Sequence, residues 1–421
     1  MILLLGAGGA MGWSWNKANN AGVHVVARGQ FFAALKADFL QGFPTAEARK
    51  RLREPVEQTM QRLETEFPAL SVEFHPVPDE ENGYLQMHFL GGGDCPGPGF
   101  PGSTEFRAYL MEPGPWNAVE AHRQFSANAA LVERVERIAA LKQRSSAGMP
   151  HDFSGFISAR AARCSSTILL MKARLAAENG DEETTLRYVQ LAGNLANHFH
   201  DVETPNLLGE TVRILLDLEI ERYAFQHLLP ALGRDADLPR WKAVLARYRY
   251  SPGDFADVMR GESQTVLRCI LLPMILDESK PERPSDAVEL AQAYASCFDK
   301  AVASLKTVTC TEWAANPVLV EEPDFSGLSR ASREILQSLM IGSKAWNKGY
   351  MRAMSVLSQH QAALDLMILE KGGIVTQGGP AGGVTRDPID GQPFVFDMAR
   401  RTLGVRETEE DRKIEPVRLP W

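Results

Sequence analysis

Apolar side chains recur at three- and four-residue spacing along most of the chain between residues 117 and 371. One such stripe consists of Ala161, Cys164, Ile168, Met171 and Leu175. Residues at this spacing share one face of an α-helix. Asn179-Gly180-Asp181 follows the stripe: Gly180 suits the left-handed residue that ends a helix, and Asp181 suits the cap of the next one. The pattern therefore predicts helices joined by tight turns.

Further helices are expected along the same stretch. They cover residues 186–199, 212–228, 239–249, 252–275, 284–305, 327–341 and 344–370, with prolines such as Pro205 and Pro230 at their ends. The rhythm of helix, short turn and helix is similar to tetratricopeptide-type hairpins, although no strict 34-residue period is visible. We therefore expect a helical-hairpin, repeat-like body over residues 104–371.

The two flanking regions have a different pattern. Residues 70–77 and 84–90 alternate between apolar and polar positions, which predicts two short strands in a small α+β region over residues 17–103. This region ends in a loop rich in glycine and proline. After residue 371, paired glycines interrupt helix formation, and residues 387–396 predict a turn that leads into a short β element within a tail over residues 372–421. The expected fold class is mainly α.

Composition narrows the class of protein. The chain has 421 residues, 44% of them hydrophobic and 23% charged, which are globular values. A net charge of −8 gives no basic excess to attract a phosphate backbone, so nucleic acid is not an expected partner. The mean hydropathy of −0.20 excludes a polytopic membrane protein. None of the five cysteines forms a C-x-x-C pair, which excludes a zinc ribbon. Cys164 and Cys269 are predicted to be core residues, whereas pairing of Cys297 with Cys310 stays open.

The first 16 residues carry no charge and allow three interpretations. The favoured one is a membrane anchor, because Trp13 and Trp15 followed by Lys17 are typical of the interface at the end of a span. A second is a buried segment of small residues.

The third interpretation is a dinucleotide-binding turn. Gly6, Gly8 and Gly12 would let backbone N–H groups approach a pyrophosphate, and Arg28 would suit a 2′-phosphate. The stretch from residue 1 to residue 29 resembles the start of ketopantoate reductase-type enzymes. Met11 occupies the position at which the motif requires its third glycine, and no alternating strand–helix units follow.

Several segments together resemble a group of uncharacterised bacterial proteins that are envelope-anchored and mainly helical. They are the apolar start ending in tryptophans, Pro76-Val77-Pro78-Asp79-Glu80-Glu81-Asn82, Arg260-Gly261-Glu262 and Asp387-Pro388-Ile389-Asp390-Gly391-Gln392-Pro393-Phe394. The last segment is also locally similar to the C-terminal turn of secretion pseudopilins. The resemblance implies a helical protein anchored in the cell envelope and facing the periplasm. It implies no catalytic residue.

The densest group of ligand-type side chains is His198, His200 and Asp201, with Glu203 nearby. Residues two apart on a helix point in different directions, so a polar helix end is favoured over a metal site.

Other groups have similarly plain interpretations. Asp79, Glu80 and Glu81 fit a charge cluster at a helix N-terminus. Asp387 and Asp390 fit a turn capped by side chains more closely than a Ca²⁺ site. Trp313, Trp346 and Tyr350 fit a packing edge as well as a binding face.

The sequence thus favours a non-catalytic, envelope-associated scaffold that binds a protein or peptide and needs no cofactor. The alternative is a cytoplasmic NADP-dependent reductase that uses Gly6, Gly8, Gly12 and Arg28. A hydrolase whose site is assembled from distant residues is a third hypothesis.

Overall fold

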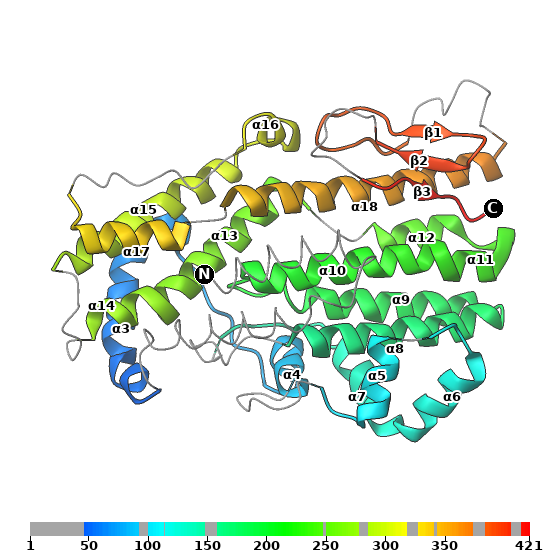
Figure 1. The fold of residues 1–421 in the computed structure, drawn as a ribbon, viewed down its shortest axis with the longest axis horizontal. Coiled ribbons are helices and arrows are strands. Elements are labelled where there is room, and N and C mark those ends of the chain that lie inside the picture. Colours follow the sequence, from blue (N-terminus) through cyan, green and yellow to red (C-terminus); the bar gives the residue numbers. More distant parts are fainter. Residues whose placement is uncertain are drawn as a thin grey trace, which may run out of the picture.

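A computed structural model gives the fold of the protein. It describes residues 46–91, 100–112, 114–147, 158–246, 250–277, 285–317, 327–340, 343–373, 384–405 and 414–421. The molecule is mainly helical, with long helices that lie side by side and a small sheet beside the last helix (Figure 1). The expected fold class is confirmed.

The helices of the first group lie on the right of Figure 1. They are α4 (Gly83–Leu90), α5 (Thr104–Met111), α6 (Ala118–Ala127), α7 (Ala129–Ala140), α8 (Ala159–Glu178), α9 (Glu182–Asn197), α10 (Leu207–Tyr223), α11 (Leu229–Leu232) and α12 (Leu238–Leu245). The turn between α8 and α9 forms as expected: Gly180 has a φ of 72°, and the Asp181 side chain accepts a hydrogen bond from the Thr184 N–H.

The second group lies on the left of the same view. It consists of α3 (Ala46–Glu66), η1 (Pro68–Leu70), α13 (Pro252–Val266), α14 (Leu272–Leu276), α15 (Ala287–Leu305), α16 (Cys310–Ala315) and α17 (Arg330–Met340). The long helix α18 (Ser343–Lys371) then runs past both groups (Figure 1).

The chain ends in a small antiparallel sheet that contacts α18. Its strands are β1 (Val395–Asp397), β2 (Thr402–Gly404) and β3 (Val417–Arg418), in the order β1-β2-β3, with Phe396 opposite Leu403 and Leu403 opposite Val417. The preceding turn is capped by side chains as expected: Asp387 accepts from the Ile389 N–H at 3.0 Å. A Ca²⁺ role is not needed to explain these carboxylates.

Two hydrophobic cores hold the helices together. The first is built by α4 to α12, the C-terminal half of α18 and the sheet. The second is built by α3, α13 to α17 and the N-terminal half of α18. Trp313 and Tyr350 belong to the second core, where their ring centroids lie 5.9 Å apart, so for these two residues the packing interpretation is confirmed. Cys164 and Cys269 are core residues as predicted, and Cys297 and Cys310 are free thiols.

A buried polar belt lies on α10 and its neighbours. Glu210, Arg213, Asp217 and Glu221 on α10 form it together with His200, Tyr250 and His360. The four α10 residues are spaced by three and four positions, so they share one helix face. Arg213 lies 2.9 Å from Glu210, Tyr250 donates to Asp217 at 2.7 Å, and His360 lies 2.7 Å from Glu221.

The expected strands over 70–77 and 84–90 are wrong. Residues 84–90 belong to α4, because Asn82 caps the helix by accepting from the Leu85 N–H. Tyr84, Met87 and Leu90 then face the first core at helical spacing. Residues 71–78 are extended but pair with no strand, so the described part of residues 17–103 is helical with an extended connection.

Pro230, expected near the end of a helix, is instead accommodated within a helical segment, and so is Pro273, which lies inside the helix expected over residues 252–275. The backbone widens into π turns at Ala224–Leu228 before Pro230 and at Leu267–Leu271 before Pro273. Proline lacks an N–H and clashes with the carbonyl four residues earlier, and a wider turn relieves both effects.

Some predictions fall on segments outside the described residues. These segments include the proposed anchor at residues 1–16 and the alternative cofactor residues Gly6, Gly8, Gly12 and Arg28. In the described ranges 46–91 and 100–112 no strand is present, so these parts lack the strand–helix alternation of a nucleotide-binding sheet. Within the described chain, no helix combines the length and apolar character needed to span a bilayer. The domain boundaries after residues 16, 103 and 371 stay predictions.

Candidate functional site

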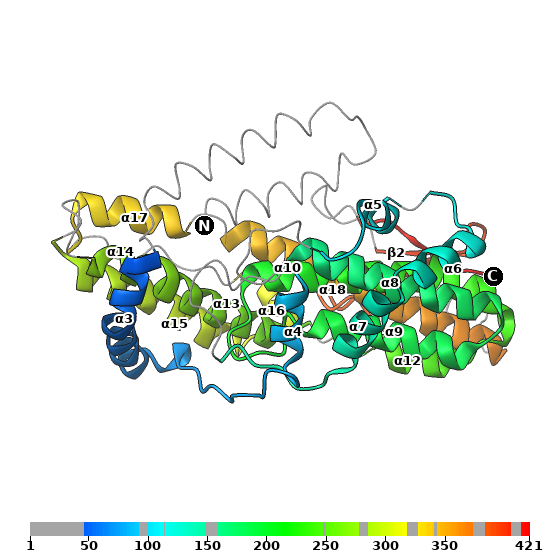
Figure 2. The same ribbon diagram turned by 90° about the horizontal axis from the view of Figure 1, so that it is seen from below.

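An open groove of about 600 Å³ lies where three segments distant in sequence meet one another beside α13. One wall is the extended segment 71–78, which runs between α3 and α4 along the lower edge of Figure 2. The opposite wall is formed by the loops 141–147 and 198–206. The lining residues are Val72, Glu73, His75, Val77, Gln143, Arg144, Asp201, Val202, Glu203 and Arg260. We call this feature the inter-loop groove.

Asn82 and Gly83 fix the extended segment to the loop 141–147. The Asn82 side chain donates to the Ser145 carbonyl at 2.9 Å and accepts from the Ser145 N–H at 3.1 Å. The Gly83 N–H donates to the Gln143 carbonyl at 2.9 Å. The two segments are therefore joined by backbone-like bonds at one end of the groove.

Glu203 joins all three segments. Its carboxylate accepts from the His75 N–H at 3.0 Å, from the Ser146 N–H at 2.7 Å and from the Ser145 hydroxyl at 2.8 Å. Burial by itself would raise the pKa of Glu203, but these hydrogen bonds stabilise the charged form, and the net pKa is lowered. Glu203 therefore acts as a charged acceptor that holds the walls of the groove in place.

His198 supports the groove from inside the protein. Its Nδ1 accepts from Arg144 Nε and its Nε2 lies against the Ile138 carbonyl, both at 2.9 Å. Because arginine only donates, Nε2 carries the imidazole proton. Complete burial, together with the Arg144 charge, lowers the pKa of His198 to about 3, so the ring is neutral at physiological pH.

Gly83 makes room for this ring. A Cβ at position 83 would lie 2.2 Å from His198 Cε1, so a larger residue does not fit without movement of the imidazole.

The three ligand-type residues singled out in the sequence do not meet. His198 contacts Arg144, His200 Nδ1 lies 3.0 Å from Glu210, and Asp201 forms an ion pair with Arg144 at 3.0 Å. No group of three His, Cys, Asp or Glu side chains in the described ranges is arranged to hold a metal ion. The helix ends at Asn197, so His198 caps it and the two residues after it turn toward different partners.

The Arg260-Gly261-Glu262 segment of α13 closes another side of the groove. A Cβ at Gly261 would lie 1.9 Å from the Pro205 carbonyl oxygen, so only glycine allows this approach of helix and loop. Glu262 accepts from the Leu207 N–H at 3.0 Å, and Arg260 lines the groove while its guanidinium lies 3.2 Å from Asp257.

Val77, the pair Asp201 and Glu203, and Arg260 belong to three separate sequence segments, and the fold brings them to one place. The groove also contains or borders on Gln143, Arg144, Ser145 and Ser146, which the sequence motifs do not include. These residues follow a helix end without any motif, and no local signal identifies them.

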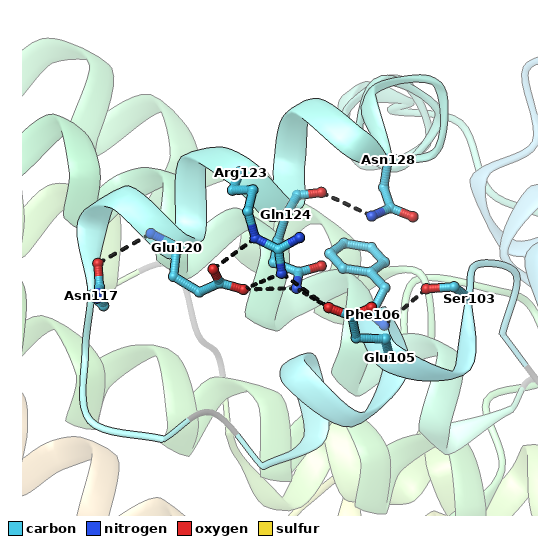
Figure 3. Close-up of polar contacts among 8 residues, drawn as sticks. All are labelled: Ser103, Glu105, Phe106, Asn117, Glu120, Arg123, Gln124 and Asn128. Carbon is cyan, nitrogen blue, oxygen red and sulfur yellow. Dashed lines mark hydrogen bonds and ion pairs between the residues drawn. The ribbon is translucent and has the colours of Figure 1, made fainter.

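A second cavity of about 500 Å³ lies between α6, α7 and the α8–α9 turn. Next along α6, Arg123 pairs with Glu105 on α5 and with Glu120 (Figure 3), at 3.0 Å and 2.7 Å respectively. Hydrogen bonds from Arg123 and Gln124 lower the pKa of Glu120 to about 2. These charged side chains pair with one another, and their ion pairs join α5 to α6.

Neither a protein-family model, nor a curated protein, nor a solved structure matches this chain.

Proposed function

We propose that the protein is a non-catalytic scaffold that binds a protein or peptide partner in the inter-loop groove. The observation that carries this proposal is the extended segment 71–78. It borders the groove, and no backbone–backbone hydrogen bond joins its residues 72–77 to another described residue. Extended chains with free backbone groups bind peptides by adding a strand, and this mode needs no reacting group.

The polar groups of the groove support binding over proton transfer. A general base works best with a pKa near the operating pH, whereas the pKa of Glu203 is lowered and its oxygens accept bonds from four backbone or hydroxyl groups. His198 is buried and its two ring nitrogens are engaged. These groups are suited to keep the walls of the groove rigid.

The helical body supplies the support that a scaffold requires. α8 packs against α9, and α9 against α10, as neighbouring rods (Figure 1). The repeat-like interpretation stays a prediction; in it, such helix pairs present a surface to a partner.

Attachment to the bacterial envelope is part of the same proposal and depends on residues 1–16. Deletion of residues 1–16 should move the protein from the membrane pellet to the supernatant after cell lysis and ultracentrifugation. Recovery of the full-length chain in the supernatant without detergent would contradict attachment.

Selection from a displayed library of random peptides tests the binding function. We expect enriched peptides whose affinity falls at least about tenfold when Gln143→Trp places a large side chain in the groove. The matched control is Glu133→Trp, which places the same side chain at the second cavity. Melting curves followed by circular dichroism establish that both variants fold.

Two outcomes contradict the proposal. One is the enrichment of no peptide. The other is enrichment of peptides that bind Gln143→Trp and the unmodified protein equally well.

A further inference from the structure

The extended wall of the groove is richer in acceptors than in donors. Pro76 and Pro78 have no N–H, and the His75 N–H already donates to Glu203. The carbonyl groups of residues 72–77 form no backbone–backbone hydrogen bond with the described part of the chain. A chain lying along this wall therefore meets more carbonyl oxygens than N–H groups, although the N–H groups of Val72, Glu73, Phe74 and Val77 also form no backbone–backbone hydrogen bond with the described part of the chain.

The segment is also preformed. His75 and Val77 each precede a proline, which restricts them to extended backbone conformations. Its position is held at one end by Asn82 and in the middle by Glu203. A partner strand would pay little to order this wall on binding.

The exposed charges beside the groove are mainly acidic. Glu73 lines the groove, Asp201 is 44% exposed, and the exposed residues Asp79 and Glu80 follow directly after the wall. The two lining arginines are more buried and face carboxylates: Arg144 is 12% exposed beside Asp201, and Arg260 is 22% exposed beside Asp257. Lys142, next to the lining residue Gln143, is an exposed cation on the opposite loop.

We infer that the partner segment is an extended, basic peptide that lies along residues 72–77, with arginine or lysine side chains directed at Glu73 and Asp79. This inference rests on the proposed function and specifies its ligand. Arginine is favoured over lysine because its guanidinium offers several donors in fixed positions to carbonyls and carboxylates.

The probe is a fluorescein-labelled heptapeptide with the sequence Arg-Val-Arg-Thr-Arg-Val-Arg, measured by fluorescence anisotropy with the full-length protein. Two counterparts carry citrulline or glutamate in place of every arginine. Citrulline keeps the shape and most donors of arginine without its charge. We expect the arginine peptide to bind at least about tenfold more tightly than the citrulline peptide at low salt, with the difference shrinking as salt screens the charges.

A separate measurement tests the backbone hydrogen bonds between the peptide and residues 72–77. Two further arginine peptides carry N-methyl groups either on the arginines or on the residues between them. Successive residues of an extended chain present their backbone groups to opposite sides, so one methylated peptide should lose binding and the other should keep it. Equal affinity of both methylated peptides would overturn the pairing along residues 72–77.

Variants of the protein test which of its acidic residues attract the arginine peptide. Glu73→Gln combined with Asp79→Asn should weaken binding of the arginine peptide by about three- to tenfold and flatten its salt dependence. Glu289→Gln, an exposed residue on α15, is the matched control and should change nothing.

The outcomes separate this inference from the proposed function. If library-selected peptides occupy the groove but the arginine heptapeptide binds no better than the citrulline or glutamate peptide, the basic ligand is wrong and the binding function stands. If the selected peptides also ignore Gln143→Trp, both proposals fail.

Discussion

At the scale of single residues, the groove depends on an imidazole that carries no charge. His198 is buried between Arg144 and the Ile138 carbonyl, with Gly83 against its ring. In this position a protonated imidazole would lose its hydration and face the Arg144 charge. The same fold that orients Arg144 toward Asp201 therefore keeps the ring neutral.

Substitution of this histidine should change how stability depends on pH. The folded-state pKa of His198, about 3, lies below the unfolded value of about 6.5, so the unfolded chain binds the extra proton first as pH falls. The group therefore costs the native state up to about 1.4 kcal/mol per pH unit below about pH 6.5. We expect unfolding in urea to show a smaller loss of stability between pH 7 and pH 5 for His198→Gln than for the unmodified protein.

His227→Gln is a suitable control, because the side chain of His227 lies outside the groove and is only half-buried, which lowers its pKa together with the charges of Arg174 and Arg222. Parallel pH profiles of His198→Gln and the unmodified protein would contradict a neutral, buried His198.

At the scale of elements, α10 combines an apolar face with a buried polar one. Val212, Leu216 and Ile220 face the first core, while Glu210 and Arg213 lie in the buried polar belt. Burial would raise the pKa of Glu210, but Arg213 and His200 stabilise its charge and the net pKa is lowered. These buried charges compensate one another, so the loss of one leaves the others buried without a counter-charge.

Removing one member of this set should be costly. Arg213→Met keeps the length of the side chain but leaves Glu210 and Asp217 without its charge. We expect a loss of about 3–5 kcal/mol in the free energy of unfolding, measured in urea.

Arg330→Met provides the comparison. Arg330 forms an ion pair with Glu334 at 2.9 Å, but it is 89% exposed, and we expect little change in stability. A similar loss for both variants would mean that Arg213 contributes no more than a surface charge.

At the scale of the whole molecule, α18 and α10 connect the two cores. α18 gives Tyr350 and Met354 to the second core and Ala362 to Met367 to the first. Between them Ser355 donates to Asp387 at 2.6 Å, and His360 lies beside Glu221. Unfolding of one core alone would leave these buried polar groups without partners, which favours a joint transition.

Cysteine protection can measure this coupling. Cys164 lies in the first core and Cys269 in the second, and both are buried. Alkylation with iodoacetamide over a urea series, followed by mass spectrometry of the peptides, should show both thiols becoming reactive at the same urea concentration. Half-buried Cys310 should react at lower urea concentration. Separate midpoints for Cys164 and Cys269 would show that the cores unfold independently.

Local features were predictable because their causes lie within a few residues. The turn at Gly180 and Asp181 and the capped turn at Asp387 form where glycine and side-chain oxygens indicated them. The segment 84–90 was misassigned because Tyr84 and Leu90 fit an alternating pattern as well as a helical one over so short a run. The cap at Asn82 and the buried position of Met87 decide in favour of the helix.

The sequence by itself determined the mainly helical class, most helix positions and the turns, because periodicity and capping act between near neighbours. Only the tertiary structure decided that the segment 71–78, the loop after α7, the loop after α9 and Arg260 surround one groove. It also decided which polar residues are buried, because contacts such as Asn82 to Ser145 and His198 to Arg144 join positions more than 50 residues apart. No local sequence pattern predicts such contacts, because they form only when complete helices pack against one another.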